Sequence, residues 1–337
     1  MSSVTVTLIP GDGIGPEVSF AAKEVLMETG IPLEWEIVEA GEACIEKYGT
    51  PLPDQVLESV KRNRVALKGP ITTPIGQGFR SVNVALRKSL GLYANVRPIR
   101  TLENVASRYT DVDMIIVREN TEDLYGGVEH QVGRDAAESI KIITREASER
   151  IGRYAFELAQ RQGRKKVTIV HKANIMKLSD GLFLESVRHV AQNFPEIECE
   201  DRIVDALCMN LVLHPEQFDV LVLPNLYGDI VSDLGAGLIG GLGVAPGANI
   251  GEEGAVFEAV HGSAPQIARR NEANPLAMIL SGVEMLEYLG YTNPASQVRR
   301  AIDNVLSNRA LLTKDLGGNA GTQEFTRSIL QAIQRLS

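Results

Sequence analysis

Cysteine is scarce in this sequence, and the spacing of the few that occur favours no covalent or metal scaffold. Cys44, Cys199 and Cys208 are the three cysteines among 337 residues. Their number is odd and no CxxC pair occurs, so neither a disulfide framework nor a zinc site is indicated. We expect all three to be small side chains of the core.

Long hydrophobic runs are also absent. No apolar run reaches the ~18 residues that a membrane span needs. The N-terminus enters a strand directly, without the basic, apolar and small-residue layout of a signal segment. We therefore expect a cytoplasmic protein that has no membrane partner.

Positive charge is outweighed by negative charge. Lys and Arg number 34 against 43 Asp and Glu, which gives a formal charge of −9. This balance argues against a general affinity for nucleic acid, although it leaves room for a local basic pocket. We expect a small-molecule partner and no nucleic acid.

What is present is the composition and pattern of an α/β protein. Hydrophobic residues make up 44% and charged residues 23%, and the length suggests two domains. Strands at Val4–Ile9 and Val167–Val170 are each followed by a predicted helix, to about Thr29 and over Ser179–Gln192. Repeated strand–helix units predict α/β architecture, with the functional site where the strands end.

Two acidic residues follow the apolar run Val220–Leu223. Pro224 ends that run, and we expect a helix to begin near Gly228, with Asp229 and Asp233 one turn apart on one face. Like charges at this spacing repel unless a cation lies between them. A solvated acidic face is the alternative, but the small and apolar residues that follow favour a buried helix, where unpaired carboxylates are costly. The pattern favours a divalent-metal site.

The glycine turn near the N-terminus resembles a dinucleotide motif without matching it. Gly11, Gly13 and Gly15 follow the first strand, but the third glycine falls one residue too early for G-x-G-x-x-G. We interpret the turn as a place where the backbone approaches a ligand or a neighbouring strand closely, and not as a Rossmann pyrophosphate site.

Three arginines near the ends of predicted elements indicate an anion site. They are Arg87, Arg97 and Arg118. One such arginine is usually a surface ion pair, but three favour a pocket for a small polyanion, because the guanidinium pairs bidentately with carboxylates. A polar loop is expected at Ile71–Arg80, and Ser81 after it suits the N-cap of the next helix.

Other polar residues carry weaker signals when taken alone. His261 follows a predicted strand, and beside Gly262 and Ser263 a nucleotide contact competes with a structural role. Tyr125 and Lys172 would each be surface residues. The segment 128–143 reads as a two-stranded excursion without a core-sized apolar face, which suggests pairing with a second subunit.

Several ordered motifs together resemble one family, the β-decarboxylating dehydrogenases that act on isocitrate, homoisocitrate, 3-isopropylmalate and tartrate. The motifs are Ile9–Gly15, Asn225–Asp233 and Thr313–Gly318, and the resemblance covers essentially the whole chain. It implies a two-domain, non-Rossmann isopropylmalate-dehydrogenase-like fold whose chain crosses twice between domains. Residues 1–99 plus 252–337 would form the larger, cofactor-side domain, and 100–251 the smaller one with the dimer arm at 128–143.

The resemblance also implies a reaction and its residues. The reaction is the metal-dependent oxidative decarboxylation of isocitrate to 2-oxoglutarate with reduction of NAD, in a homodimer with shared active sites. Tyr125 would be the acid and Lys172 the base, the latter from the partner chain. Mg²⁺ or Mn²⁺ would bind Asp229, Asp233 and a partner-chain Asp205. The tricarboxylate would bind Ser81, Asn83, Arg87, Arg97 and Arg118, because a serine and an asparagine on that helix distinguish isocitrate enzymes.

Cofactor contacts follow from the same resemblance. They are Thr72, His261, Gly262, Ser263, Ala264, Gln266, Ile267, Asn274 and Asp315. NAD enzymes of the family usually carry an acid at the position of Gln266, and bacterial NADP enzymes carry Lys-Tyr at 266 and 267. Gln266 and Ile267 match neither pattern, and Lys314 or a neighbouring arginine, Arg269 or Arg270, would be able to reach a phosphate. NAD is favoured and NADP remains the alternative.

Two further alternatives stay open. Homoisocitrate is one methylene longer than isocitrate, and such a difference supplies only about 1–3 kcal/mol of discrimination. A non-catalytic regulatory subunit, of the kind found in multi-subunit relatives, is the third hypothesis. Such subunits lose catalytic groups, whereas Tyr125, Lys172 and the three aspartates are all present here.

Overall fold

The computed structural model describes residues 3–72 and 81–336. The chain forms two compact units: unit 1 comprises Met1–Leu90, Thr101–Thr110 and Ile239–Ser337, and unit 2 comprises Gly91–Arg100 and Asp111–Leu238. None of the helices in the described ranges has the length and apolar character of a membrane-spanning segment. Most of the polar loop expected at Ile71–Arg80 lies outside the described residues.

Unit 1 is built on a mostly parallel sheet. Each neighbouring pair is parallel except the last, which is antiparallel. All residues of β3, β12 and β11 are buried, as expected for strands that are covered on both faces. In spatial order the strands are β2 (Leu33–Ile37), β1 (Val4–Ile9), β3 (Val65–Lys68), β12 (Ala255–Ala259) and β11 (Pro246–Gly251).

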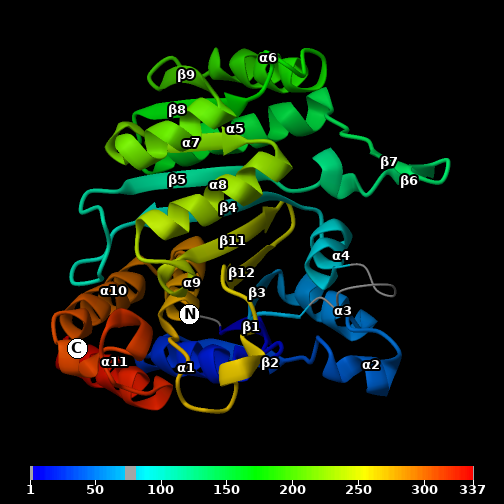
Figure 1. The fold of residues 1–337 in the computed structure, drawn as a ribbon. Helices are drawn as coiled ribbons and strands as arrows, with labels where there is room; N and C mark the ends of the chain where they lie inside the picture. Colours follow the sequence, from blue (N-terminus) through cyan, green and yellow to red (C-terminus); the bar gives the residue numbers. More distant parts are fainter. Residues whose placement is uncertain (1–2, 73–80, 337) are drawn as a thin grey trace. The chain divides into compact units, whose positions relative to one another are not determined.

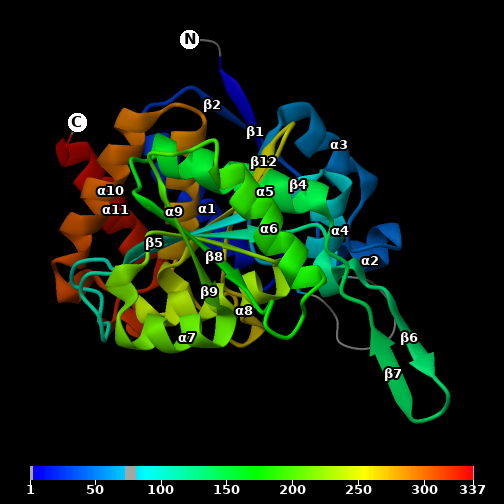
Figure 2. The same ribbon diagram turned by 90° about the horizontal axis from the view of Figure 1, so that it is seen from above.

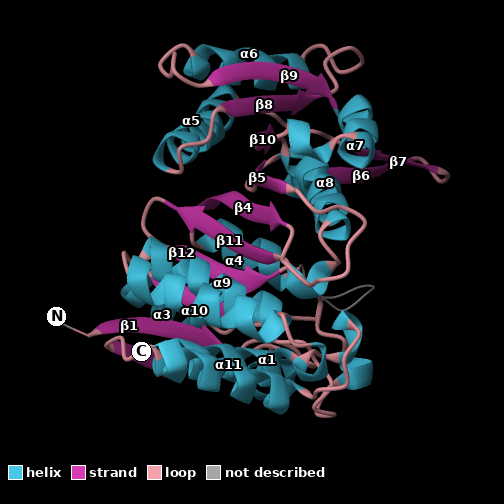
Figure 3. Cartoon of the chain, turned by 90° about the vertical axis from the view of Figure 1, so that its left-hand side faces the viewer, coloured by secondary structure: helices cyan, strands magenta, loops and turns pink. Residues whose placement is uncertain are grey.

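Helices cover the sheet of unit 1 (Figure 3). The central one is α9, which is apolar on nearly every side because it packs on β11 and β12 as well as on α1 and α10. Next to α1 lies α11, which packs on both α1 and α10 (Figure 1). The helices are α1 (Gly15–Glu28), α2 (Ala43–Tyr48), α3 (Asp54–Asn63), α4 (Val82–Ser89), α9 (Leu276–Tyr288), α10 (Thr292–Leu306) and α11 (Thr322–Leu336).

Unit 2 has a second run of strands. The first pair is antiparallel and the others are parallel, so the carboxyl ends of β5, β10, β8 and β9 share one edge. In spatial order they are β4 (Leu92–Arg100), β5 (Asp113–Glu119), β10 (Val220–Leu223), β8 (Lys166–His171) and β9 (Glu198–Ile203). As predicted, the polar candidates Arg118, Lys172 and Asp205 lie at this edge.

Helices lie on both faces of the unit 2 sheet. One face carries α5 (Arg145–Arg161) and α6 (Ser179–Ala191), which pack on each other, and the other carries α7 (Val204–Leu213) and α8 (Asn225–Leu238) (Figure 2). This arrangement follows from right-handed crossovers, because the chain moves outward along the sheet through α5 and α6 and returns through α7.

The predicted excursion is a two-stranded hairpin that extends from unit 2 (Figure 2). Its strands β6 (Glu129–Val132) and β7 (Ala136–Ser139) pair antiparallel, and all their residues are exposed. A short 3₁₀ turn, η1 (Asp123–Gly126), precedes the hairpin and carries Tyr125.

The boundaries of the units differ from the expected domain limits. The units divide after residues 90, 100, 110 and 238, whereas the expected limits lie after residues 99 and 251. Strand β4 pairs with β5 over the register Ala94↔Glu119 to Arg100↔Asp113, which attaches it to unit 2. The connection that follows, 101–110, returns to unit 1, where Val105 lies against Gly240.

The expectation for the cysteines is partly wrong. Cys44 is buried, but Cys208 is half-buried and Cys199 is exposed. Cys199 lies on β9, which is the outermost strand of its run and whose residues are exposed or half-buried. Composition does not reveal which strand lies at the edge.

Candidate active site

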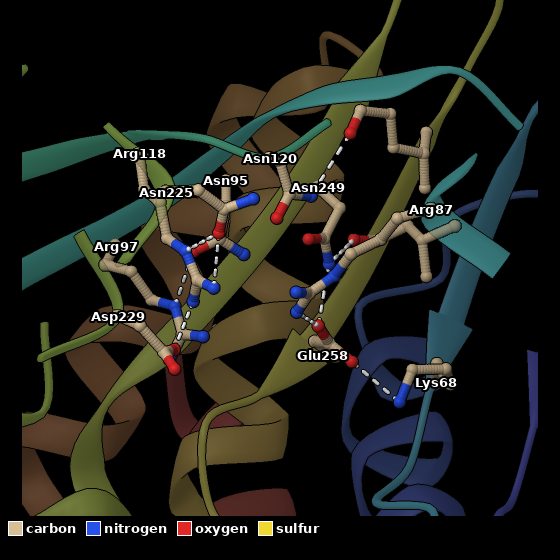
Figure 4. A network of polar contacts seen from close by, with 12 residues as sticks. Lys68, Arg87, Asn95, Arg97, Arg118, Asn120, Asn225, Asp229, Asn249 and Glu258 are labelled. Carbon is tan, nitrogen blue, oxygen red and sulfur yellow. Dashed lines mark hydrogen bonds and ion pairs between the residues drawn. The ribbon is translucent and has the colours of Figure 1, made fainter. Parts of the chain in front are cut away.

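Arg118 joins the end of β5 to the first turn of α8. Its Nε and one terminal nitrogen donate to Oδ1 of Asn225 at 2.9 and 2.7 Å, and its other terminal nitrogen pairs with Asp229 (Figure 4). The side chain is 1% exposed. Charge-assisted bonds in a buried setting hold the guanidinium firmly. Asn225 was not among the predicted site residues, although its place between a strand end and a helix was a signal.

A glycine makes this arrangement possible. A Cβ on Gly228 would lie 2.4 Å from Cγ and 2.6 Å from Cβ of Arg118, far inside van der Waals contact. The arginine side chain therefore crosses α8 where the helix has no side chain. Gly228 thus allows close packing within the helix. The sequence predicted that the helix begins near Gly228, but it begins at Asn225.

The variant Gly228→Ala is expected to displace Arg118. The arginine would lose its pairing with Asn225 and Asp229. The kcat/KM for isocitrate, the substrate that the family resemblance implies, should therefore fall about 10²-fold, as for a 1 Å misplacement of a positioned group. Steady-state kinetics would measure this. Gly237→Ala on the same helix is the matched control, because a Cβ there meets nothing within 4 Å. Equal activity of both variants would contradict the expectation.

Tyr125 and Arg118 both bind the carboxylate of Asp229. The phenol of Tyr125 donates to Oδ2 of Asp229, and the Arg118 guanidinium lies 5.0 Å from the centre of the tyrosine ring. Burial opposes ionisation of Asp229, but the charges of Arg118 and Arg97 and the bond from Tyr125 hold its pKa below the usual range. Burial and the charge of Asp229 raise the pKa of Tyr125, so the phenol keeps its proton at neutral pH.

Arg97 completes the basic part of this cluster. It is buried, and its Nε donates to Oδ1 of Asn95 at 2.8 Å. Arg97 lies near the end of strand β4, as expected, and the strand continues through Pro98 to Arg100. The structure therefore brings together Arg97, Arg118, Tyr125 and Asp229, all within unit 2.

Lys172 and Asp205 form a second cluster in unit 2. Lys172 follows β8 and its ammonium pairs with the carboxylate of Asp205 in the first turn of α7. The hydrogen bond from Lys172 lowers the pKa of Asp205. Asp205 is 68% exposed, so this side chain faces solvent in the single chain.

The carboxylates of α8 fit a divalent cation only in part. Asp229 is 44% exposed and Asp233 is exposed, so the expected burial holds for one face of the helix only. Carboxylate oxygens are ligands that Mg²⁺ and Mn²⁺ accept. Among the described residues, however, no three His, Cys, Asp or Glu side chains form a group suited to a metal. Two carboxylates of one chain need a third ligand from elsewhere.

Helix α4 of unit 1 carries the other predicted substrate residues. Ser81 occupies the N-cap position, as expected, but its side chain does not cap the helix. Oδ1 of Asn83 and Nε of Arg87 are buried and have no hydrogen-bond partner among the described residues. Buried polar atoms are rarely left unsatisfied, and a bound polar ligand is one way to satisfy them. This observation fits the predicted role of α4.

An acidic residue that the sequence analysis missed holds Arg87. Glu258 on β12 pairs with Arg87 at 3.2 Å and with Lys68 at 2.6 Å, and accepts from Asn249 at 2.7 Å (Figure 4). Glu258 is buried, yet the charges of Lys68 and Arg87 outweigh its burial and lower its pKa. The sequence did carry a signal for this pair: Lys68 and Glu258 are the charged residues of two otherwise apolar strands, β3 and β12.

The predicted cofactor residues all lie in unit 1. Gly13, with φ of +59°, approaches so closely that a Cβ would lie 2.0 Å from the carbonyl oxygen of Ser263, and the next amide donates to that oxygen at 2.8 Å. The hydroxyl of Ser263 is hydrogen-bonded to that of Thr72 at 2.7 Å. The glycine turn therefore approaches a neighbouring segment of the chain, as one of the two interpretations held.

A second group of cofactor candidates surrounds Asp315. Asn274 donates to Asp315 at 2.9 Å, and Asp315 also acts on His261 electrostatically. Burial lowers the pKa of His261 and keeps its imidazole neutral, while its Nε2 is buried without a partner among the described residues. An unsatisfied neutral imidazole fits a nucleotide base. Gln266 is exposed on the turn Pro265–Ile267, which follows Gly262 and Ala264.

The fold and these clusters define the class of protein. The family described as isocitrate/isopropylmalate dehydrogenase matches residues 5–329. The chain therefore belongs to the isocitrate/isopropylmalate dehydrogenase family, and the fold class that its motifs predicted is confirmed.

Particular relatives are similar over nearly the whole chain. Catalytic subunit 5 of mitochondrial NAD isocitrate dehydrogenase from Arabidopsis thaliana is 54% identical over 327 residues, 97% of this chain and 87% of that subunit. A regulatory subunit of the mitochondrial NAD enzyme from Dictyostelium discoideum is 53% identical over 97% and 91%. The crystal structure of isocitrate dehydrogenase from Methylococcus capsulatus has a TM-score of 0.95 at 52% identity and covers 99% and 100%.

Proposed function

We propose that the protein is an NAD-dependent isocitrate dehydrogenase, which converts isocitrate to 2-oxoglutarate and CO₂. The observation that carries the proposal is the cluster of Tyr125, Asp229 and Arg118 at the carboxyl ends of β5 and β10. It joins a protonated phenol, an ionised carboxylate and a buried guanidinium. These are an acid, a metal ligand and an anion-binding group of the kind that this reaction needs.

The tricarboxylate is the proposed substrate because α4 is polar where an isopropylmalate enzyme would be apolar. Ser81 and Asn83 would bind the third carboxylate, and the unpartnered Oδ1 of Asn83 supports a polar ligand. Arg97, Arg118 and the free Nε edge of Arg87 would bind the other two carboxylates.

Asp229 and Asp233, with the partner subunit's Asp205, would hold a Mg²⁺ or Mn²⁺ ion. When bound, the ion would polarise the substrate oxygen and stabilise the negative charge that develops on it. The described residues of one chain offer an incomplete ligand set, and Asp205 is exposed; both observations support a shared site. The Asp229 carboxylate remains ionised through its arginine neighbours and is therefore ready for a cation.

Two residues move protons in the proposed reaction. The partner subunit's Lys172 would accept the hydroxyl proton, and NAD, when bound, would take the hydride from the same carbon. The resulting β-keto acid loses CO₂, and the electron pair of the broken C–C bond remains on the substrate. Tyr125 donates its proton to the carbon that lost CO₂ and so forms 2-oxoglutarate. Lys172 accepts one proton and Tyr125 donates one, so the two proton transfers balance.

NAD is the proposed cofactor. The relatives from Arabidopsis and Dictyostelium carry NAD in their names. Gln266 is exposed and brings no positive charge for a 2′-phosphate. NADP remains the alternative, since Arg269, Arg270 and Lys314 are exposed cations in the same part of unit 1.

A homodimer is part of the proposal. Unit 2 exposes aliphatic side chains on α7 and α8, which a second copy would cover: Met209 is 55% exposed, Leu213 58% and Ile230 57%. The hairpin at 129–139 would add an arm to that interface.

The cytoplasmic location stays a prediction, and the relatives from Arabidopsis and Dictyostelium are named as mitochondrial.

A regulatory subunit is the second candidate, because a relative at 53% identity is named as one. The presence of Tyr125, Lys172, Asp205, Asp229 and Asp233 favours catalysis. Homoisocitrate dehydrogenase is the third candidate.

Initial rates of the purified protein test all of these. Isocitrate and homoisocitrate are each combined with NAD and NADP, with Mg²⁺ present or chelated. We expect isocitrate with NAD to be the fastest pair and chelation to lower its rate at least about 10²-fold. A preference for homoisocitrate would refute the substrate assignment. No turnover with any pair would refute catalysis and favour the regulatory subunit.

A further inference from the structure

Lys141 lies among buried acidic groups that no step of the proposed reaction uses. It follows β7 on the segment that returns from the hairpin, and its side chain is 13% exposed. Its ammonium is 2.5 Å from Oδ1 of Asp180, 3.9 Å from Oδ1 of Asp123 and 4.5 Å from the ring centre of Tyr227. Both carboxylates are fully buried.

Asp123 ties the turn that carries Tyr125 to helix α8. Its Oδ2 accepts from the amide of Leu226 in the first turn of α8 at 2.9 Å, and its own amide donates to the carbonyl oxygen of Ile142 at 2.9 Å. Asp123 has φ of +70°, a left-handed conformation that a residue other than glycine holds only when its surroundings enforce it. The position of Tyr125 therefore depends on how Asp123 is held.

Asp180 ties the segment that carries Lys172 to the same helix. Its Oδ2 accepts from the backbone amide of Lys172 at 2.6 Å. The phenol of Tyr227, also in the first turn of α8, donates to Asp180, and burial together with the charge of Asp180 raises the pKa of that phenol. The position of Lys172 therefore depends on how Asp180 is held.

The two aspartates need a cation between them. Both carboxylates have no exposure to solvent, and backbone donors satisfy their lone pairs without supplying charge. Within residues 3–72 and 81–336, the ion pairs of Asp123 and Asp180 are those with Lys141. Lys141 thus joins the two aspartates that fix Tyr125 and Lys172.

We propose that Lys141 is a positioning residue for both proton-transfer groups. It contacts no reacting atom, but it holds the turn of Tyr125 and the backbone of Lys172 against one end of α8. This inference rests on the proposed function, which assigns the proton transfers. If the active sites are shared, each Lys141 aligns the acid of its own subunit's site and the base of its partner's.

The variant Lys141→Met tests the proposal, because it keeps the length of the side chain and removes its charge. We expect kcat to fall about 10²-fold with the KM for isocitrate changed less than about threefold, as for misplaced catalytic groups. Exchange of the C3 hydrogens of 2-oxoglutarate with D₂O, followed by NMR, reports Tyr125 separately and should slow by a similar factor. Lys141→Arg should recover at least about tenfold of the loss.

Arg164→Met is the matched control. Arg164 also bridges two carboxylates of unit 2, Asp113 at 2.6 Å and Asp219 at 3.0 Å, but it lies at the amino ends of β5 and β10, away from the site. Its loss should lower the melting temperature and leave kcat per folded subunit within about twofold. A purely structural role of Lys141 would make the two variants alike.

The outcomes are separable. If the wild type does not turn over isocitrate, the proposed function fails. If the wild type is active and Lys141→Met keeps its kcat and exchange rate, or Arg164→Met loses as much, the positioning role fails. If Lys141→Met does not fold, Tyr227→Phe decides: a kcat lowered at unchanged KM for NAD supports the role, and an unchanged kcat overturns it.

Discussion

Replacing Lys172 with Met is expected to lower kcat about 10³-fold, within the range that a general base contributes. The side chain of Lys172 is 26% exposed and its amine is placed by a bond to Asp205 and by the backbone contact with Asp180. Methionine keeps the length and apolar stem but accepts no proton. The KM for isocitrate should change less than about threefold. Stopped-flow and steady-state NADH formation would measure both.

The control and a complementation experiment sharpen this result. Lys177→Met removes an exposed cation five residues on and should leave kcat unchanged. Mixing Lys172→Met with Tyr125→Phe, after dissociation and reassociation, should restore about a quarter of wild-type activity, because half the random dimers would carry one intact site of two. No recovery would contradict a base that comes from the partner subunit.

Glu258→Gln is expected to destabilise the protein by about 3–5 kcal/mol, which is the loss typical of a broken buried ion pair. Glutamine keeps the shape but leaves Lys68 and Arg87 facing each other without a negative charge between them. Denaturant unfolding, together with the melting temperature, would measure the loss. Glu253→Gln removes an exposed acid just before the same strand and should stay within about 0.5 kcal/mol of the wild type.

The same variant should change how stability depends on pH. The pKa of Glu258 is lower in the folded protein than in the unfolded chain, so its contribution is complete above the unfolded pKa of about 4.3. That contribution is lost as the pH falls below this value toward the folded pKa. Wild-type stability should therefore fall between about pH 5 and pH 3 more steeply than that of Glu258→Gln. Parallel curves would contradict the assignment.

Local patterns in the sequence predicted many of the helices and strands. The strands at Val4–Ile9 and Val220–Leu223 and the hairpin at 128–143 match the structure, since periodicity and turn residues act over short distances. The start of α8 was misplaced by three residues. Its first-turn amide at Leu226 is capped by Asp123, which is 103 residues away in the chain and gives no local signal.

Contacts between distant segments account for the rest. Glu258, Asn225 and Lys141 each occur as ordinary polar residues, and their importance depends on which strands become neighbours. The packing of Arg118 over Gly228 likewise requires β5 and α8 to lie together. The resemblance to a family supplied the proposed roles of Tyr125 and Lys172, but it did not supply the groups that hold them.

The division of the chain also has a consequence for biosynthesis. Unit 1 needs both ends of the sequence, because β12 is the strand that lies between β3 and β11. The ion pair of Arg87 with Glu258 cannot form until Glu258 has been synthesised. Glu258 follows Arg87 by 171 residues, or roughly 10–30 s at ordinary elongation rates. Unit 2 is nearly continuous and is complete in the meantime. The nascent chain therefore carries the exposed edge of β3 until its last third is made, and this is the stage at which a chaperone would have most to protect.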